Sequence, residues 1–197
     1  MISSKPNKLI LIGASTGGPG LIERIVTALD VLNGVSIVIA QHMDRLSLAS
    51  FAKRLHRIYP EEVVLVSDRL PIQSGRIYVI HDTATIHYKH NAFILEMQSM
   101  QESYYHPTID LLFDSAAMLH NIKISAYLLS GIGADGAAGM FELQERGFKT
   151  VAQDELSSIV YGMPKRALEM GAAQQVLSID EIIRDIQQEV YENVCTI

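Results

Sequence analysis

Three side chains with the chemistry of a nucleophile, a base and an orienting acid each follow an apolar, strand-like run of this chain. They are Ser15, His42 and Asp135, and the runs before them span residues 9–12, 35–40 and 124–129. In open parallel α/β sheets the carboxyl ends of the strands share one edge, where ligands bind. We therefore expect the three loops to converge. Together the three side chains predict a serine hydrolase.

The segment from Gly13 to Gly17 around Ser15 fits G-x-S-x-G, the sharp strand-to-helix turn that exposes a nucleophilic serine. Free N–H groups at the start of the following helix can stabilise an oxyanion. The same residues also suit a simple helix cap formed by Ser15 or Thr16. The segment lacks the lysine of a phosphate-binding P-loop. It therefore indicates either a nucleophile or a cap.

A second glycine motif supports a competing hypothesis. Gly131, Gly133 and Gly136 satisfy G-x-G-x-x-G, the fingerprint of dinucleotide-binding enzymes, and so are also consistent with a nucleotide-binding oxidoreductase. Asp135 argues against it, because its carboxylate would lie at the helix N-terminus where a pyrophosphate must bind. The candidate nucleophile and base would also have no role. We favour Asp135 as the orienting acid of a triad in the chain order Ser, His, Asp.

Four histidines raise the question of a metal: His81, His87, His90 and His106. They lie on both sides of a predicted hairpin without a companion cysteine or a regular pattern of carboxylates. We therefore expect no metal site and no cofactor.

The composition indicates one globular domain. Of 197 residues, 48% are hydrophobic and 19% charged. The formal charge of −6 disfavours nucleic acid and anionic membrane surfaces as partners. No apolar run reaches the roughly 18 residues of a membrane span, and Cys195 is the only cysteine. We expect a cytoplasmic protein with no direct membrane insertion.

Apolar runs alternate with helix-period segments along the chain, which predicts an α/β fold. Further strands are expected over 63–66, 76–80 and 149–152, a turn at Pro71 and Gly75, and an antiparallel hairpin over 83–97. Helices are expected over 21–29, 48–58, 107–119, 136–146, 164–170 and 178–191. The sequence thus predicts a single doubly wound, mostly parallel sheet over 1–197, with helices on both faces and an antiparallel hairpin.

With these motifs the chain resembles the catalytic domain of the chemotaxis receptor methylesterases, the CheB family. The matching segments are 13–18, Gln41-His42-Met43, 107–113, 135–140 and Tyr161-Gly162-Met163-Pro164. The resemblance implies a doubly wound fold. It also implies hydrolysis of glutamate γ-methyl esters on the cytoplasmic helices of methyl-accepting chemotaxis receptors, with deamidation of receptor glutamines as a second reaction.

By match of motif, the resemblance implies that Ser15 is the nucleophile, His42 the general base and Asp135 its partner. It also implies an oxyanion donor at the backbone amide of Ile132. Thr16 matches a hydroxyl beside the nucleophile.

Three departures from the family pattern concern specificity. Ala134 stands where the family commonly has asparagine, residues 44–47 replace Pro-Pro-Gly-Phe, and residues 105–107 read Tyr-His-Pro instead of His-Arg-Pro. The first two change the loops beside the acid and the base. Met43 and Arg45 follow the base directly and are expected to contact substrate.

Family members usually carry a phosphorylatable receiver domain ahead of the catalytic domain, whereas the first strand here begins within ten residues of Met1. We therefore expect no receiver domain and no response to phosphodonors. Because the chain is acidic, docking to receptor helices needs local cations, and Arg45, Lys165 and Arg166 are the candidates. A non-catalytic module that binds receptor helices stays a third hypothesis.

Overall fold

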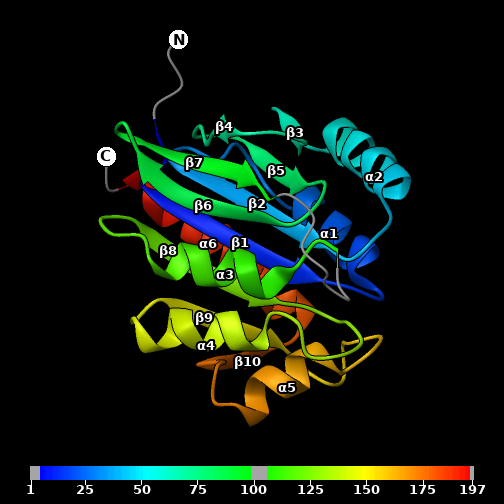
Figure 1. Ribbon diagram of the computed structural model, residues 1–197. Helices are drawn as coiled ribbons and strands as arrows, with labels where there is room; N and C mark the ends of the chain where they lie inside the picture. Colours follow the sequence, from blue (N-terminus) through cyan, green and yellow to red (C-terminus); the bar gives the residue numbers. More distant parts are fainter. Residues whose placement is uncertain (1–4, 99–105, 196–197) are drawn as a thin grey trace.

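A parallel sheet runs through the middle of the molecule, with a layer of other elements on each of its two faces (Figure 1). Across residues 5–98 and 106–195, which the computed structural model describes, seven parallel strands pair in the order β10-β9-β8-β1-β2-β5-β3. In this order they span Gln175–Leu177, Lys149–Gln153, Lys123–Leu128, Lys8–Ala14, Val35–Gln41, Ile77–Ile80 and Val63–Val66. A smaller antiparallel sheet contains β4 (Leu70–Pro71), β7 (Ala92–Met97) and β6 (Ala84–Lys89).

Helices cover both faces of the large sheet. One face packs against α1 (Gly18–Thr27), α2 (Arg45–Ile58) and α6 (Ile179–Cys195). The other packs against α3 (Ile109–Ala117), α4 (Ala137–Glu145), α5 (Met163–Glu169) and the small sheet. Figure 1 shows α3 and α4 lying across the face opposite to α6. The prediction of a doubly wound sheet is confirmed.

The central strand β1 explains why its sequence is a continuous apolar run. Leu9 and Leu11 point into the core under α3 and α4, whereas Ile10 and Ile12 point into the core under α1 and α6, and all four are fully buried. A parallel strand covered on both faces has no solvent-facing side, so it needs no polar alternation.

Two short strands were not predicted. The expected turn is confirmed at Gly75 and wrong at Pro71, because Leu70 and Pro71 form β4 and pair with Leu95 and Ile94 of β7. Proline has no N–H to donate, so it is tolerated in a sheet at an edge, and β4 is an edge strand. The hairpin over 83–97 is confirmed, but it belongs to this second sheet. The other unpredicted strand, β10, has three residues and pairs with β9 at the edge of the large sheet.

A buried ionic cluster fixes α6 against the sheet. The Glu189 carboxylate lies 2.7 Å from the Lys8 ammonium of β1 and 2.7 Å from the Lys149 ammonium of β9, and its side chain is 7% exposed. Lys149 also lies 2.6 Å from Asp185, which accepts a 2.6 Å hydrogen bond from the Tyr127 hydroxyl. Burial opposes the ionisation of Glu189, but Lys149 and Lys8 outweigh it and lower its pKa.

Replacing Glu189 with glutamine should therefore destabilise the fold. E189Q leaves two ammonium groups without a shared anion, and we expect the free energy of unfolding to fall by about 3 kcal/mol at pH 7. Because folding lowers the Glu189 pKa, the stability it contributes is present above its unfolded value of about 4.3 and is lost as the pH falls through the folded value. Urea denaturation at several pH values measures both effects.

The matched control is E192Q on the exposed side of the same helix, which should change the unfolding free energy by less than about 0.5 kcal/mol. Equal stability of E189Q and E192Q at pH 7 would contradict the structural role of the cluster.

Candidate active site

The three predicted loops meet at the carboxyl edge of the sheet. In the parallel register Ala14 of β1 lies beside Gln41 of β2, and Gly13 lies beside Leu128 of β8. The register continues past the strand ends, where the His42 amide donates to the Ala14 carbonyl at 2.9 Å. On the other side the Ser15 amide donates to the Ser130 carbonyl at 3.0 Å. The serine turn is therefore held between the loops that carry the histidine and the aspartate.

The partly buried His42 and the buried Asp135 form a close pair. The Nε2 atom of His42 lies 2.7 Å from Oδ2 of Asp135, and their side chains are 11% and 2% exposed. If Nε2 carries the proton and donates it to the carboxylate, the lone pair of the neutral ring is on Nδ1. The predicted proximity of these two residues is confirmed.

The first turn of α3 completes the surroundings of Asp135. The Ile109 amide donates to Oδ2 at 2.8 Å and the Asp110 amide donates to Oδ1 at 3.0 Å. Burial opposes ionisation of Asp135, but the hydrogen bonds from His42 and from the two amides outweigh it and lower its pKa. The carboxyl group is therefore an anion at neutral pH. The contribution of α3 was not predicted, although its first turn lies in the family-like segment 107–113.

The turn around Ser15 is held by its backbone. The N-cap of α1 is Gly17, with φ 86° and no side-chain cap, so the hypothesis that Ser15 or Thr16 caps this helix is wrong. The Ser15 carbonyl instead accepts from the Gly18 amide at 2.9 Å and from the buried Gln41 side chain at 2.8 Å. The serine side chain is partly exposed.

Gln41 links the serine and histidine loops, a role that was not predicted from the sequence. Its Nε2 donates to the Ser15 carbonyl and, at 3.0 Å, to the His42 carbonyl. An amide side chain at the end of a fully buried strand was the available signal, because buried polar groups need partners.

The loop after β8 packs directly on the serine turn. A Cβ added at Gly131 would lie 2.7 Å from the Ser15 Cβ and 2.2 Å from the Met163 sulfur, so only glycine fits there. The Gly131 carbonyl accepts from the Gly162 and Met163 amides at 3.1 and 2.9 Å. Ile132 follows at the surface and is 61% exposed.

The dinucleotide-binding hypothesis fails at this loop. The Asp135 carboxylate lies just before the α4 N-terminus and is already bound by His42 and α3, where that hypothesis requires a pyrophosphate. The residues from Val160 to Met163 also contact Gly131.

The remaining predicted site residues, Thr16, Met43 and Arg45, follow Ser15 and His42 in the chain. Thr16 is exposed, and Met43 packs partly buried against the α1–α2 side of the core. A cavity of about 300 Å³ follows Met43 and contains Arg45, Asp82 and His106. Arg45 forms an ion pair with Asp82, whose other oxygen lies 3.2 Å from His106 Nδ1.

The three candidate docking cations all have partners in the chain itself. Besides the Arg45 pair, Lys165 and Arg166 lie 4.0 and 3.7 Å from Glu169, and these side chains are about half exposed. Exposed ion pairs of this kind contribute little to stability, so either side chain can readily take another charged partner. Tyr105, at the family's departure before Pro107, lies outside the described residues.

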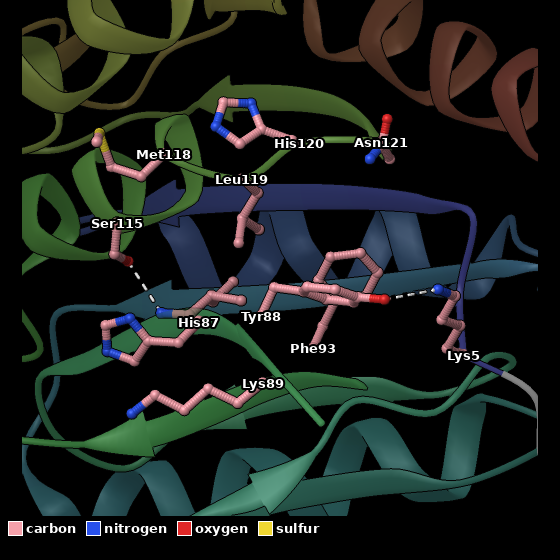
Figure 2. Close-up of a pocket in the computed structure, with 11 residues that line it drawn as sticks. Lys5, His87, Tyr88, Lys89, Phe93, Ser115, Met118, Leu119, His120 and Asn121 are labelled. Carbon is pink, nitrogen blue, oxygen red and sulfur yellow. Dashed lines mark hydrogen bonds between the residues drawn. The ribbon is translucent and has the colours of Figure 1, made fainter. Parts of the chain in front are cut away.

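A larger cavity of about 640 Å³ lies elsewhere, between β6 and the end of α3 (Figure 2). Lys5 and Asn121 on its wall precede the amino ends of β1 and β8, whereas the His42–Asp135 pair lies at the carboxyl edge. This cavity is therefore separate from the candidate site.

The described residues contain no group of three or more histidine, cysteine, aspartate or glutamate side chains arranged to hold a metal ion. Of the four histidines considered as metal ligands, His87 contacts Thr85 and His106 contacts Asp82. No helix in this part of the chain is long and apolar enough to cross a membrane.

The fold and this edge define a doubly wound α/β protein in which the loops that carry a serine, a histidine and a buried aspartate meet at the carboxyl edge of the sheet.

Comparison with known proteins gives the family. Residues 10–186 match the CheB methylesterase family, and the chain belongs to it. The catalytic domain of CheB methylesterase from Thermotoga maritima superposes with a TM-score of 0.85 and 28% identity, covering 92% of this chain and 98% of that one.

Curated relatives carry one shared name, protein-glutamate methylesterase/protein-glutamine glutaminase. The protein from Hahella chejuensis is 37% identical over 190 residues, which are 95% of this chain and 52% of that protein. The protein from Rhodospirillum rubrum is 36% identical over 178 residues, which are 88% of this chain and 48% of that protein. The chain thus spans about half the length of these relatives.

The close packing at Gly131 generates a prediction. In G131A the new methyl group must displace Met163 or Ser15, and we expect the free energy of unfolding to fall by about 1–3 kcal/mol. G20A is the matched control, because a Cβ at Gly20 meets nothing within 4 Å. Urea denaturation of both variants measures the difference, and a G131A protein as stable as G20A would contradict the described packing.

Proposed function

We propose that this chain is a protein-glutamate methylesterase that hydrolyses γ-methyl esters of glutamate on the cytoplasmic helices of chemotaxis receptors. Family membership and the shared name of the relatives support this proposal. The observation that carries it is the 2.7 Å contact between His42 and the buried Asp135, next to the Ser15 turn. Deamidation of receptor glutamines by the same site is the second proposed reaction. The proposed place of action is the cytoplasm, where these receptor helices lie.

Ester hydrolysis proceeds in two stages. The Ser15 oxygen attacks the ester carbonyl while His42 accepts the serine proton at Nδ1, and a tetrahedral oxyanion forms. His42 then gives this proton to the departing methoxide, which leaves as methanol, and the glutamyl group stays on Ser15 as an ester. A water molecule attacks that ester by the same route, which releases the glutamate side chain and restores the serine.

Asp135 stabilises the charge that develops on His42. The imidazolium exists in the transition states of both stages, and it forms 2.7 Å from a carboxylate whose side chain is 2% exposed. Because water does not screen this pair, the attraction is stronger than it would be at the surface. The two α3 amides keep Asp135 in place without competing for the proton.

The proposed oxyanion donor is the backbone amide of Ile132. Its support is the contact between Gly131 and the Ser15 Cβ, which brings the loop beside the attacked carbonyl. Thr16 supplies a hydroxyl next to the nucleophile on the exposed side of the turn.

Substrate contacts are proposed for Met43 and Arg45 in the cavity beyond His42. Because Arg45 is paired with Asp82, an acidic receptor side chain would have to compete with that carboxylate. Lys165 and Arg166 are less tightly paired and are the better candidates for docking acidic helices.

Single replacement of Ser15 or His42 by alanine should lower the rate of methanol release from methylated receptor membranes by at least about 10⁴-fold. The double variant should be little worse than either single variant, because the two residues act as one unit.

Lys123→Ala, a change at the exposed amino end of β8, is the control and should retain the wild-type rate. A wild-type protein that binds receptor helices without releasing methanol would favour the non-catalytic hypothesis. A Ser15→Ala variant with a near-normal rate would refute the assigned nucleophile.

A further inference from the structure

Asp110 is a partly buried carboxyl group beside the candidate site, and the proposed reaction does not use it. It lies in the first turn of α3, where its backbone amide donates to Asp135 Oδ1 at 3.0 Å. Its own Oδ1 accepts from the Gly139 amide of α4 at 2.8 Å. Asp110 therefore connects the triad carboxylate to two helices.

The packing of α4 on α3 leaves Asp110 little freedom. A Cβ added at Gly139 would lie 2.6 Å from the Asp110 carbonyl oxygen and 2.7 Å from the Phe113 Cβ. The two helices are thus in direct backbone contact at the point where Asp110 and Asp135 meet. A shift of the Asp110 backbone would move one of the donors to Asp135.

Two acidic groups act on the Asp110 carboxyl group. They are Asp135, which accepts from the Asp110 amide, and Asp114 one turn along α3. Glu142 of α4 faces Asp114 in turn. Burial raises the pKa of Asp110 to about 6, and the charge of Asp135 adds to the shift, although the Gly139 amide opposes it. Asp110 is therefore the member of this acidic pair that takes up a proton first.

We propose that Asp110 is a positioning residue of this site, which holds Asp135 against His42 and sets the charge of the acidic pair beside the imidazole. This inference rests on the proposed role of His42 as the base. With a proton on Asp110 the pair carries one negative charge. Without it the pair carries two negative charges, which stabilise the His42 imidazolium more strongly.

The pH dependence of methanol release distinguishes this role from simple packing. Asp110→Asn keeps the backbone amide that donates to Asp135 and an acceptor for Gly139, but it fixes the pair at one negative charge. The imidazolium is then less stabilised, so the acid limb of kcat/KM should move to lower pH by about half a unit. At the plateau of the pH profile kcat should fall about threefold to tenfold. KM should stay unchanged, because the interaction that the substitution removes is made only in the transition state.

Asp114→Asn is the matched control on the same helix. It removes one negative charge from the neighbourhood without touching Asp135, and its acid limb and kcat should stay close to those of the wild type. If the acid limb of kcat/KM for Asp110→Asn superposes on the wild-type limb, the proposal is overturned. Replacing a carboxyl group with a purely structural role would leave this limb unchanged.

A measurement on the unaltered chain makes the test independent of the folding of any variant. Carboxyl ¹³C NMR of the wild type should show Asp110 titrating at about pH 6, with the Asp135 signal responding to the same proton. An Asp110 signal that titrates at an ordinary aspartate pH, without an Asp135 response, would also overturn the proposal. Retained activity in Ser15→Ala would instead refute the proposed function itself.

Discussion

The negative charge of Asp135 is buried, and the structure around it follows from the need to compensate that charge. An isolated carboxylate at such a position would be protonated or would destabilise the fold. Asp135 instead accepts hydrogen bonds from His42 and from the first two amides of α3, where the helix dipole also favours an anion. The same contacts lower its pKa and orient the imidazole.

This requirement connects distant parts of the chain. The parallel register brings the ends of β1, β2 and β8 to one edge, and Gln41 ties the first two loops together there. Alignment of strands alone would leave the aspartate without partners. The α3 N-terminus supplies them, and the close contact of α3 with α4 at Gly139 keeps that terminus in place. The geometry of the proposed triad is thus a property of both the sheet and its covering helices.

Much of this arrangement could be predicted from the sequence, because the signals are local. Continuous apolar runs mark strands buried on both faces, and Ser15, His42 and Asp135 each follow one of them. The contributions of Gln41 and the α3 amides could not be predicted, since they depend on which polar groups meet after folding. The Gly17 cap, the edge strand at Pro71 and the pairing of Arg45 with Asp82 were also decided by tertiary contacts rather than by local sequence.

In the proposed mechanism the anionic charge of Asp135 makes His42 an effective base. This is tested by kcat for methanol release by Asp135→Asn, whose side chain is nearly isosteric. We expect a loss of about 10⁴-fold with the fold retained, because the neutral amide no longer stabilises the imidazolium or selects the tautomer. A folded Asp135→Asn protein that keeps a rate within about tenfold of the wild type would contradict this mechanism.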